Sequence, residues 1–84
     1  MYINIGGDFV VRDKDIVSIM DIENTSTSKI TKEFFRKIGK EVIYISSELP
    51  RSFIITGDKK NMKVYISPVS SQTLYKRVIN KNQW

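Results

Sequence analysis

A chain of 84 residues with neither cysteine nor histidine has few ways to stabilise a folded state. A domain of this size buries only about two-thirds of the surface that its unfolded chain exposes. Small domains commonly compensate with disulfides, bound metals or self-association. Disulfides and metal sites built from thiolates or imidazoles are excluded here, and no loop is rich in carboxylates. We therefore expect one domain over residues 1–84, without metal or cofactor, that forms a homo-oligomer.

Short runs of β-branched and apolar residues, separated by turn-forming residues, dominate the chain. The Gly6-Gly7 pair predicts a tight turn between the first two runs. Pro68 ends the last run, because proline cannot donate to a strand ladder. The links between the later runs have hairpin length, which predicts antiparallel pairing. We expect five to six short strands, at about 2–5, 9–11, 16–22, 42–45, 53–56 and 62–67.

A first helix is predicted between the strands, at about residues 28–39. Thr27 or Ser28 is a good N-cap, and Gly39 suits the left-handed position that follows many helices. Apolar residues at intervals of four indicate the face that packs on the core. The stripe expected to face the core consists of Ile30, Phe34 and Ile38, with Phe35 beside it.

A second helix is predicted at the C-terminal end, at about residues 70–80, capped by Ser70 or Ser71. A frayed tail is expected after it. The expected fold class is therefore α+β, with a small antiparallel sheet, one inserted helix and one C-terminal helix. The inner face of the second helix is expected to consist of Leu74, Tyr75, Val78 and Ile79.

The charge is unevenly distributed along the chain. The whole chain has a net charge of +5, but residues 1–25 carry −3 and residues 26–84 carry +8. An acidic segment beside a basic one can dock head-to-tail on a neighbouring copy, or it can leave a basic face free for a polyanion. A solvated surface with a charge bias is the third interpretation, and many small basic domains have no nucleic-acid role.

The residue types argue against an enzyme. Catalysis without histidine or cysteine must use serine, lysine, tyrosine or carboxylates. Gly6-Gly7-Asp8 lacks the spaced glycines and the lysine of a phosphate-binding loop. The serines at 67, 70 and 71 have no base near them in the sequence, so helix capping accounts for them better than a nucleophile role. We expect no catalysis and no small-molecule substrate.

Three groups of basic residues are candidates for binding a polyanion, although each also suits a solvated face. A cation near the end of a helix is favoured by the helix dipole as well. From charge and helix placement we select Lys76 and Arg77 as candidate contacts. The groups are Lys29, Lys32, Arg36, Lys37 and Lys40; Arg51 with Lys59, Lys60 and Lys63; and Lys76, Arg77 and Lys81.

No part of the sequence indicates a membrane protein. The chain has no run of about 18 apolar residues, which a membrane-spanning helix requires. Its first residues lack the basic start and long apolar stretch of a signal peptide. We therefore expect a cytoplasmic protein.

Several blocks of residues occur in an order and spacing typical of one known family. They are Met1-Tyr2-Ile3, Gly-Asp-Phe-Val-Val at 7–11, Asp15-Ile16-Val17, Glu33-Phe34-Phe35 and the run from Tyr65 to Arg77. Together they resemble, nearly end to end, the RemB branch of the extracellular matrix regulator (RemA/RemB) family of spore-forming bacteria. The resemblance implies a LytTR-like α+β subunit, assembly into rings, and regulation of biofilm matrix operons through DNA along a basic surface.

The resemblance also implies positions for DNA contacts. Where the RemA branch has an arginine after its second turn, this chain has Asp15 with Lys14 beside it, and Arg51 stands where that branch has an arginine cluster. The predicted nucleic-acid-binding residues are Arg12, Lys14 and Arg51 from the resemblance, with Lys76 and Arg77 from charge. The expected function is a ring-forming, DNA-associated transcriptional regulator. The alternative is an oligomeric scaffold that binds a protein partner or a nucleotide-like ligand instead of DNA, which the mixed charges of residues 12–15 favour.

Overall fold

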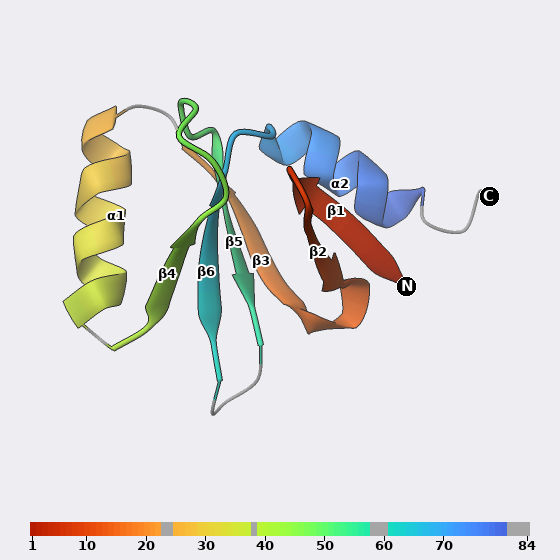
Figure 1. Cartoon of the computed structure of the whole chain (residues 1–84), viewed down its shortest axis with the longest axis horizontal. Coiled ribbons are helices and arrows are strands. Elements are labelled where there is room, and N and C mark those ends of the chain that lie inside the picture. Colours follow the sequence, from red (N-terminus) through yellow and green to blue (C-terminus); the bar gives the residue numbers. More distant parts are fainter. Residues whose placement is uncertain (23–24, 38, 58–60, 81–84) are drawn as a thin grey trace.

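In the part of the chain that the structure describes, six short strands and two α-helices follow one another in the predicted order, and the α+β class is confirmed (Figure 1). The structure is a computed structural model that describes residues 1–22, 25–37, 39–57 and 61–80. The strands are β1 (Tyr2–Gly6), β2 (Phe9–Arg12), β3 (Ile16–Asp21), β4 (Glu41–Tyr44), β5 (Ser52–Thr56) and β6 (Lys63–Ser67). The helices are a 3-10 turn, η1 (Asp13–Asp15), and the α-helices α1 (Thr25–Lys37) and α2 (Ser71–Ile79).

The predicted turn at Gly6-Gly7 joins β1 and β2 into an antiparallel hairpin. Both glycines have positive φ values, 129° and 53°, which most other residues adopt only with strain. A Cβ on Gly6 would also press against the side chains of Ile45 and Ser67. Glycine is needed at this position because the turn lies directly against the rest of the protein.

The other four strands form a separate sheet in the order β3-β5-β6-β4, so the prediction of a single antiparallel sheet was wrong. β5 pairs antiparallel with β6, as predicted from the hairpin-length link between them, and it also pairs antiparallel with β3. β4 pairs with β6 in parallel, with Val42 opposite Val64. The link over residues 45–51 is long enough to pass the end of β6, which therefore inserts between β4 and β5.

The four-stranded sheet separates two apolar clusters. One lies between the sheet, the β1–β2 hairpin and α2, and the other lies on the side of α1. Alternate residues of each central strand enter opposite clusters, as the period of a strand requires. The first cluster is Ile3, Ile5, Val11, Ile19, Ile54 and Leu74, and the second is Phe53, Val64 and Ile66.

Helix α2 begins as predicted, because the Ser70 hydroxyl accepts a hydrogen bond of 3.2 Å from the Thr73 N–H. Leu74 is fully buried. The hydroxyl of Tyr75 donates a 2.7 Å hydrogen bond to the carbonyl of Ile19, on the edge strand β3. This contact occupies a main-chain acceptor at the edge of the sheet. The prediction that Ile79 faces inward was wrong: it is 75% exposed.

Helix α1 runs over Thr25–Lys37, three residues ahead of the predicted start, and is followed by Gly39 with a positive φ of 77°. Its predicted core-facing stripe was wrong, since Ile30 is 69% and Phe34 57% exposed, while Ile38 lies outside the described residues. Phe35 packs on the second apolar cluster instead. Two cations on the adjacent flank of the helix contact Tyr44 on β4. The Lys32 ammonium lies 4.8 Å from the centroid of the Tyr44 ring, and Arg36 donates a hydrogen bond of 3.4 Å to the Tyr44 hydroxyl. These contacts hold the flank of α1 that carries Lys32 and Arg36 against β4.

Candidate nucleic-acid interface

Most of the charged side chains at residues 12–15 form ion pairs. Arg12 donates to Asp15 through Nε at 2.9 Å and through Nη2 at 3.4 Å. This hydrogen bond and the charge of Asp15 raise the pKa of the Arg12 guanidinium above its ordinary value. The N-terminal ammonium forms an ion pair with Asp13 at 3.3 Å.

Lys14 is the exception in this segment. Its side chain is exposed, and its ammonium has no ion pair with any residue that the structure describes. The 3-10 turn η1 positions it, because the Lys14 N–H donates a 2.9 Å hydrogen bond to the Asp13 carboxylate. Of the two basic residues predicted here, Lys14 is therefore the one whose charge is available to a ligand.

Arg51 has an exposed side chain on a fixed backbone. Its N–H donates to the carbonyl of Ser67 at 2.8 Å, and its own carbonyl accepts from the Ile22 N–H at 3.0 Å. The residue is thus held between the ends of β3 and β6, directly before β5. Among the described residues, no hydrogen bond or ion pair engages the guanidinium. A guanidinium in this state has all its donors free for a bidentate contact with phosphate.

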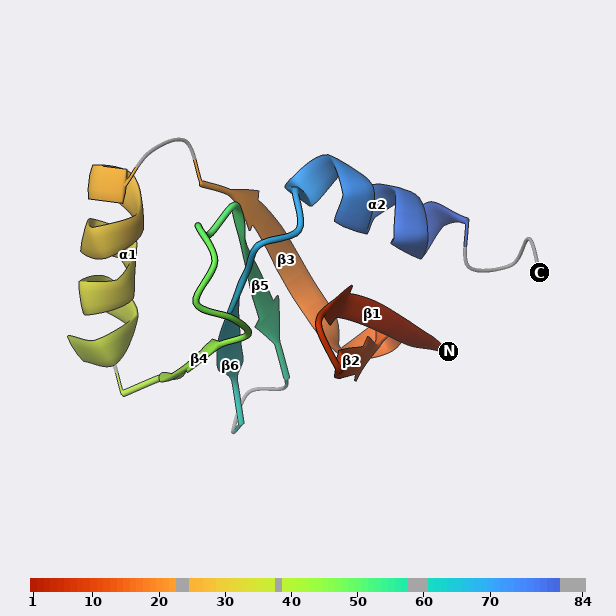
Figure 2. The same cartoon turned by 45° about the horizontal axis from the view of Figure 1, so that its top comes forward.

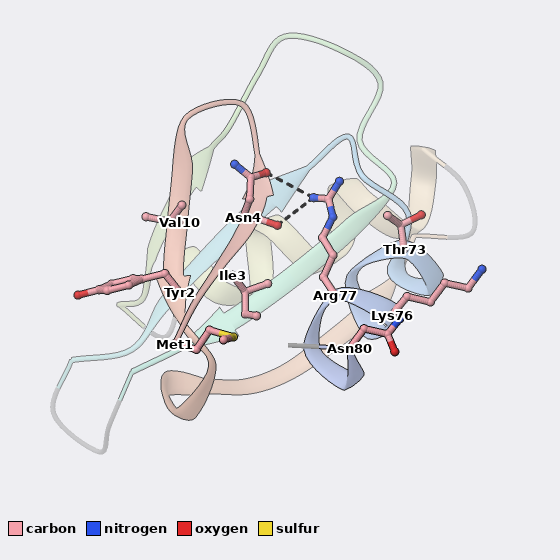
Figure 3. A pocket seen from close by; sticks show the side chains of 9 residues that line it. All are labelled: Met1, Tyr2, Ile3, Asn4, Val10, Thr73, Lys76, Arg77 and Asn80. Atoms are coloured by element: carbon pink, nitrogen blue, oxygen red, sulfur yellow. Dashed lines mark hydrogen bonds between the residues drawn. The ribbon is translucent and has the colours of Figure 1, made fainter. Parts of the chain in front are cut away.

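Lys76 and Arg77 lie on α2 beside the β1–β2 hairpin (Figure 3). Arg77 Nη1 donates to the main-chain carbonyl of Asn4 at 2.9 Å and approaches the Asn4 side-chain oxygen at 3.4 Å. Arg77 therefore fastens the helix to the hairpin. Lys76 is exposed and has no such partner among the described residues.

A groove of about 480 Å³ lies between the hairpin and α2. Apart from Asn4, its lining is apolar on the hairpin side, and it is polar on the helix side (Figure 3). Sequence reasoning missed it, because its two walls lie some 70 residues apart in the chain and neither wall has a recognisable motif. The lining residues are Met1, Tyr2, Ile3, Asn4, Val10, Thr73, Lys76, Arg77 and Asn80.

The five predicted residues do not form one cluster within a subunit. Lys14 lies at the end of the sheet where Ile16 pairs with Thr56, and Arg51 lies at the other end, where Asp21 pairs with Ser52. Four strand steps of about 3.4 Å separate these ends, which places the two cations well over 10 Å apart. A continuous basic surface that uses both therefore needs either a long ligand or more than one copy of the chain.

The described residues hold no group of three or more acidic side chains placed to bind a metal ion. None of the described helices is both long and apolar enough to cross a membrane. The candidate site consists of cations and a groove, and this arrangement can bind an anion or a protein surface.

Comparisons with known proteins identify the family of the chain. Residues 2–78 match the RemA-like family, described as extracellular matrix regulatory protein A-like. The chain is also 40% identical over 77 residues to extracellular matrix regulatory protein B of Bacillus subtilis (strain 168). The matched residues are 92% of this chain and 89% of that protein. The chain belongs to the RemA-like family of extracellular matrix regulators.

Much of the segment that carries this resemblance has a structural role in the fold. Ser67 forms a hydrogen bond to β1, and Ser70 caps α2. Tyr75 forms a hydrogen bond to β3, and Arg77 forms one to β1. Ser71 donates to the carboxylate of Asp21 at 3.1 Å. The resemblance in this segment therefore reports the fold more directly than it reports ligand contacts.

Proposed function

We propose that this chain is a non-catalytic transcriptional regulator of extracellular matrix genes that assembles into a ring and contacts DNA through phosphates. Membership of the RemA-like family supports the regulatory role. The observation that carries the DNA contact is Arg51, an unpaired guanidinium on a backbone held by hydrogen bonds on both sides. A contact residue whose backbone is already ordered loses less conformational entropy when it binds.

Lys14 and Arg51 are the proposed direct contacts, and Arg12, Lys76 and Arg77 contribute to the positive potential around them. One subunit presents these cations in separate places. In a ring, each contact would recur at regular intervals, and many weak phosphate contacts would act together on one DNA molecule. We propose the ring for this reason and place the protein in the cytoplasm, where such DNA is found.

A salt titration of DNA binding tests the proposal. Duplex DNA is mixed with the assembled protein, and fluorescence anisotropy gives the affinity at several salt concentrations. We expect the logarithm of the association constant to fall linearly with the logarithm of the salt concentration, by about 0.9 per phosphate neutralised. An assembled protein that binds no duplex at low salt would rule out the DNA contact.

The Arg51→Glu variant locates the contact. It should weaken binding about tenfold or more and flatten the salt dependence, because each subunit loses one phosphate contact and gains a repulsive charge. Lys29→Glu is the matched control: it makes the same change in charge at an exposed position on α1. Equal losses in the two variants would mean that net charge, and not Arg51, governs binding.

A second candidate is an oligomeric scaffold that binds a protein partner instead of DNA. The ion pair of Arg12 with Asp15 favours it, because it neutralises one of the two cations of the loop. This candidate predicts that an assembled protein shows no salt-dependent DNA binding, so the same titration separates the two functions.

A further inference from the structure

A second groove, of about 400 Å³, lies where the hairpin and η1 meet the ends of β5 and β6. It shares Tyr2 and Val10 with the hairpin–α2 groove, but the rest of its lining is different. Figures 1 and 2 show the hairpin on the side of the four-stranded sheet away from α1 in both views. Side chains of the sheet that face the hairpin can therefore reach this groove.

The strand register directs three polar side chains of the sheet toward the hairpin. Thr56 on β5 lies opposite Lys63 on β6, and Ile54 lies opposite Tyr65. Directly opposed residues share a face of the sheet, and so do residues two apart on one strand. Ile54 belongs to the apolar cluster beneath the hairpin, so the other three residues face the hairpin as well. All three line the second groove.

Thr56 has a buried hydroxyl without a partner. The residue is only 5% exposed, and no hydrogen bond among the described residues engages its side chain. The hydroxyls of the other buried residues, Ser52, Ser67 and Ser71, each donate to a protein acceptor. A buried polar group that lacks a partner is unfavourable, and beside a groove it indicates the place of a ligand atom.

Two tyrosine rings supply an aromatic lining. The Tyr65 ring packs on the first apolar cluster and makes an edge contact with Phe9, at 6.1 Å between centroids, which fixes its position. Within the described part of the chain, its hydroxyl also lacks a hydrogen bond. Tyr2 lines the groove from β1 and is 69% exposed. Exposed aromatic rings of this kind can stack on the planar base of a nucleotide.

The charged lining of the groove consists of two cations and one carboxylate, so it is positive overall. Lys63 is exposed and forms no ion pair with any described residue. Arg12 uses Nε and Nη2 to bind Asp15, which leaves Nη1 for a ligand. The Gly57 N–H donates a 2.9 Å hydrogen bond to the Asp15 carbonyl, so the end of β5 and η1 are held together before a ligand arrives.

We infer that this groove binds one nucleotide unit. The base lies against the tyrosine rings, the phosphate lies between Lys63 and Arg12, and the Thr56 hydroxyl bonds to a polar atom of the ligand. A volume of about 400 Å³ falls in the range of small-molecule sites. The unit belongs either to a free mononucleotide or to a single strand, because the bases of a duplex are stacked on each other. The inference does not depend on the proposed contact with duplex DNA.

Isothermal titration calorimetry of the full chain with AMP and with GMP tests the inference. Adenosine and ribose 5-phosphate each lack one half of the unit and should bind at least about tenfold more weakly than AMP. Saturation-transfer NMR should give its strongest signals at the base protons of AMP, because the base lies against the tyrosine rings. A short single strand of deoxyadenylate separates the two sources: binding about tenfold tighter than AMP would indicate a strand, and weaker binding a free nucleotide.

Two variants locate the ligand. Thr56→Val keeps the shape of the side chain and should weaken AMP binding about tenfold without lowering the melting temperature, because the hydroxyl has no protein partner to lose. Lys63→Glu should also weaken it about tenfold or more, because it places a negative charge beside the phosphate. Lys37→Glu is the matched control: it makes the same change in charge at an exposed position on α1 and should leave AMP binding unchanged.

Three results would overturn the inference. They are no binding of AMP, GMP or the single strand, binding of ribose 5-phosphate as tight as that of AMP, and unchanged AMP binding in Thr56→Val. These measurements contain no duplex DNA. Nucleotide binding without duplex binding would therefore refute the proposed DNA contact alone, and the opposite pattern would refute this nucleotide site alone.

Discussion

The hydroxyl of Ser67 donates a 2.6 Å hydrogen bond to the carbonyl of Ile5, 62 residues earlier in the chain. The same oxygen accepts a 3.0 Å hydrogen bond from the Val69 N–H. Ser67 lies on β6 of the four-stranded sheet and Ile5 on β1 of the hairpin, so this buried hydroxyl joins the two sheets. It thereby holds one wall of the hairpin–α2 groove in place.

Replacing this hydroxyl should destabilise the protein. Ser67→Ala leaves the buried Ile5 carbonyl and the partly buried Val69 N–H without their partner, at a cost of about 1–3 kcal/mol. Urea unfolding, followed by circular dichroism, measures the free energy of unfolding. Ser47→Ala, at an exposed position, is the control and should change this free energy by no more than about 0.5 kcal/mol. Equal effects would show that Ser67 does not link the sheets energetically.

Two aliphatic residues on α2 should respond very differently to truncation. Leu74 is fully buried and Ile79 is 75% exposed. Leu74→Ala should lower the free energy of unfolding by about 2–5 kcal/mol, because it removes apolar contacts and leaves a cavity. Ile79→Ala should change it by about 0.5 kcal/mol or less. Thermal unfolding of both variants provides the comparison, and a large loss at Ile79 would place it in a contact that the subunit does not contain.

Releasing Arg12 should strengthen DNA binding under the proposed function. Asp15→Asn removes the carboxylate that holds the guanidinium at 2.9 Å and leaves an additional free cation beside Lys14. The affinity should rise, and the salt dependence should steepen by about one phosphate per participating subunit. The salt titration by anisotropy measures both quantities. Binding unchanged in strength and slope would mean that this loop does not face the DNA.

A rise in pH should leave this same pair intact. Hydrogen bonding to Asp15 raises the pKa of Arg12, so the guanidinium stays charged at every pH at which proteins are normally studied. The pair therefore should not weaken as the pH rises through neutrality, and the anisotropy titration repeated at a higher pH checks this.

Local features were predictable from the sequence because neighbouring residues decide them. The Gly6-Gly7 turn, the Ser70 cap and the order of strands and helices all follow from backbone preferences and side-chain capping. The pairing of β4 was not predictable in this way. A short link favours antiparallel neighbours, and only the insertion of β6 made the pair of Val42 and Val64 parallel.

The candidate site shows the same division. Charge and resemblance predicted five basic residues, and these are properties of single positions. Whether a cation is free depends on what lies against it: Asp15 engages Arg12, Asn4 engages Arg77, and Arg51 has no such partner among the described residues. The Arg12–Asp15 pair is local, but Arg77 and Asn4 lie 73 residues apart, so no local pattern reports their contact.

Composition and local pattern were enough to establish a small α+β chain without disulfides, a charge divided between an acidic start and a basic remainder, and a resemblance to the matrix regulators. The tertiary structure decided which apolar stripe is buried. Periodicity shows that Ile30 and Phe34 share a face of α1, but not what covers that face. In the folded subunit nothing among the described residues covers it, because α1 is turned so that Phe35 meets the sheet and its cations meet Tyr44.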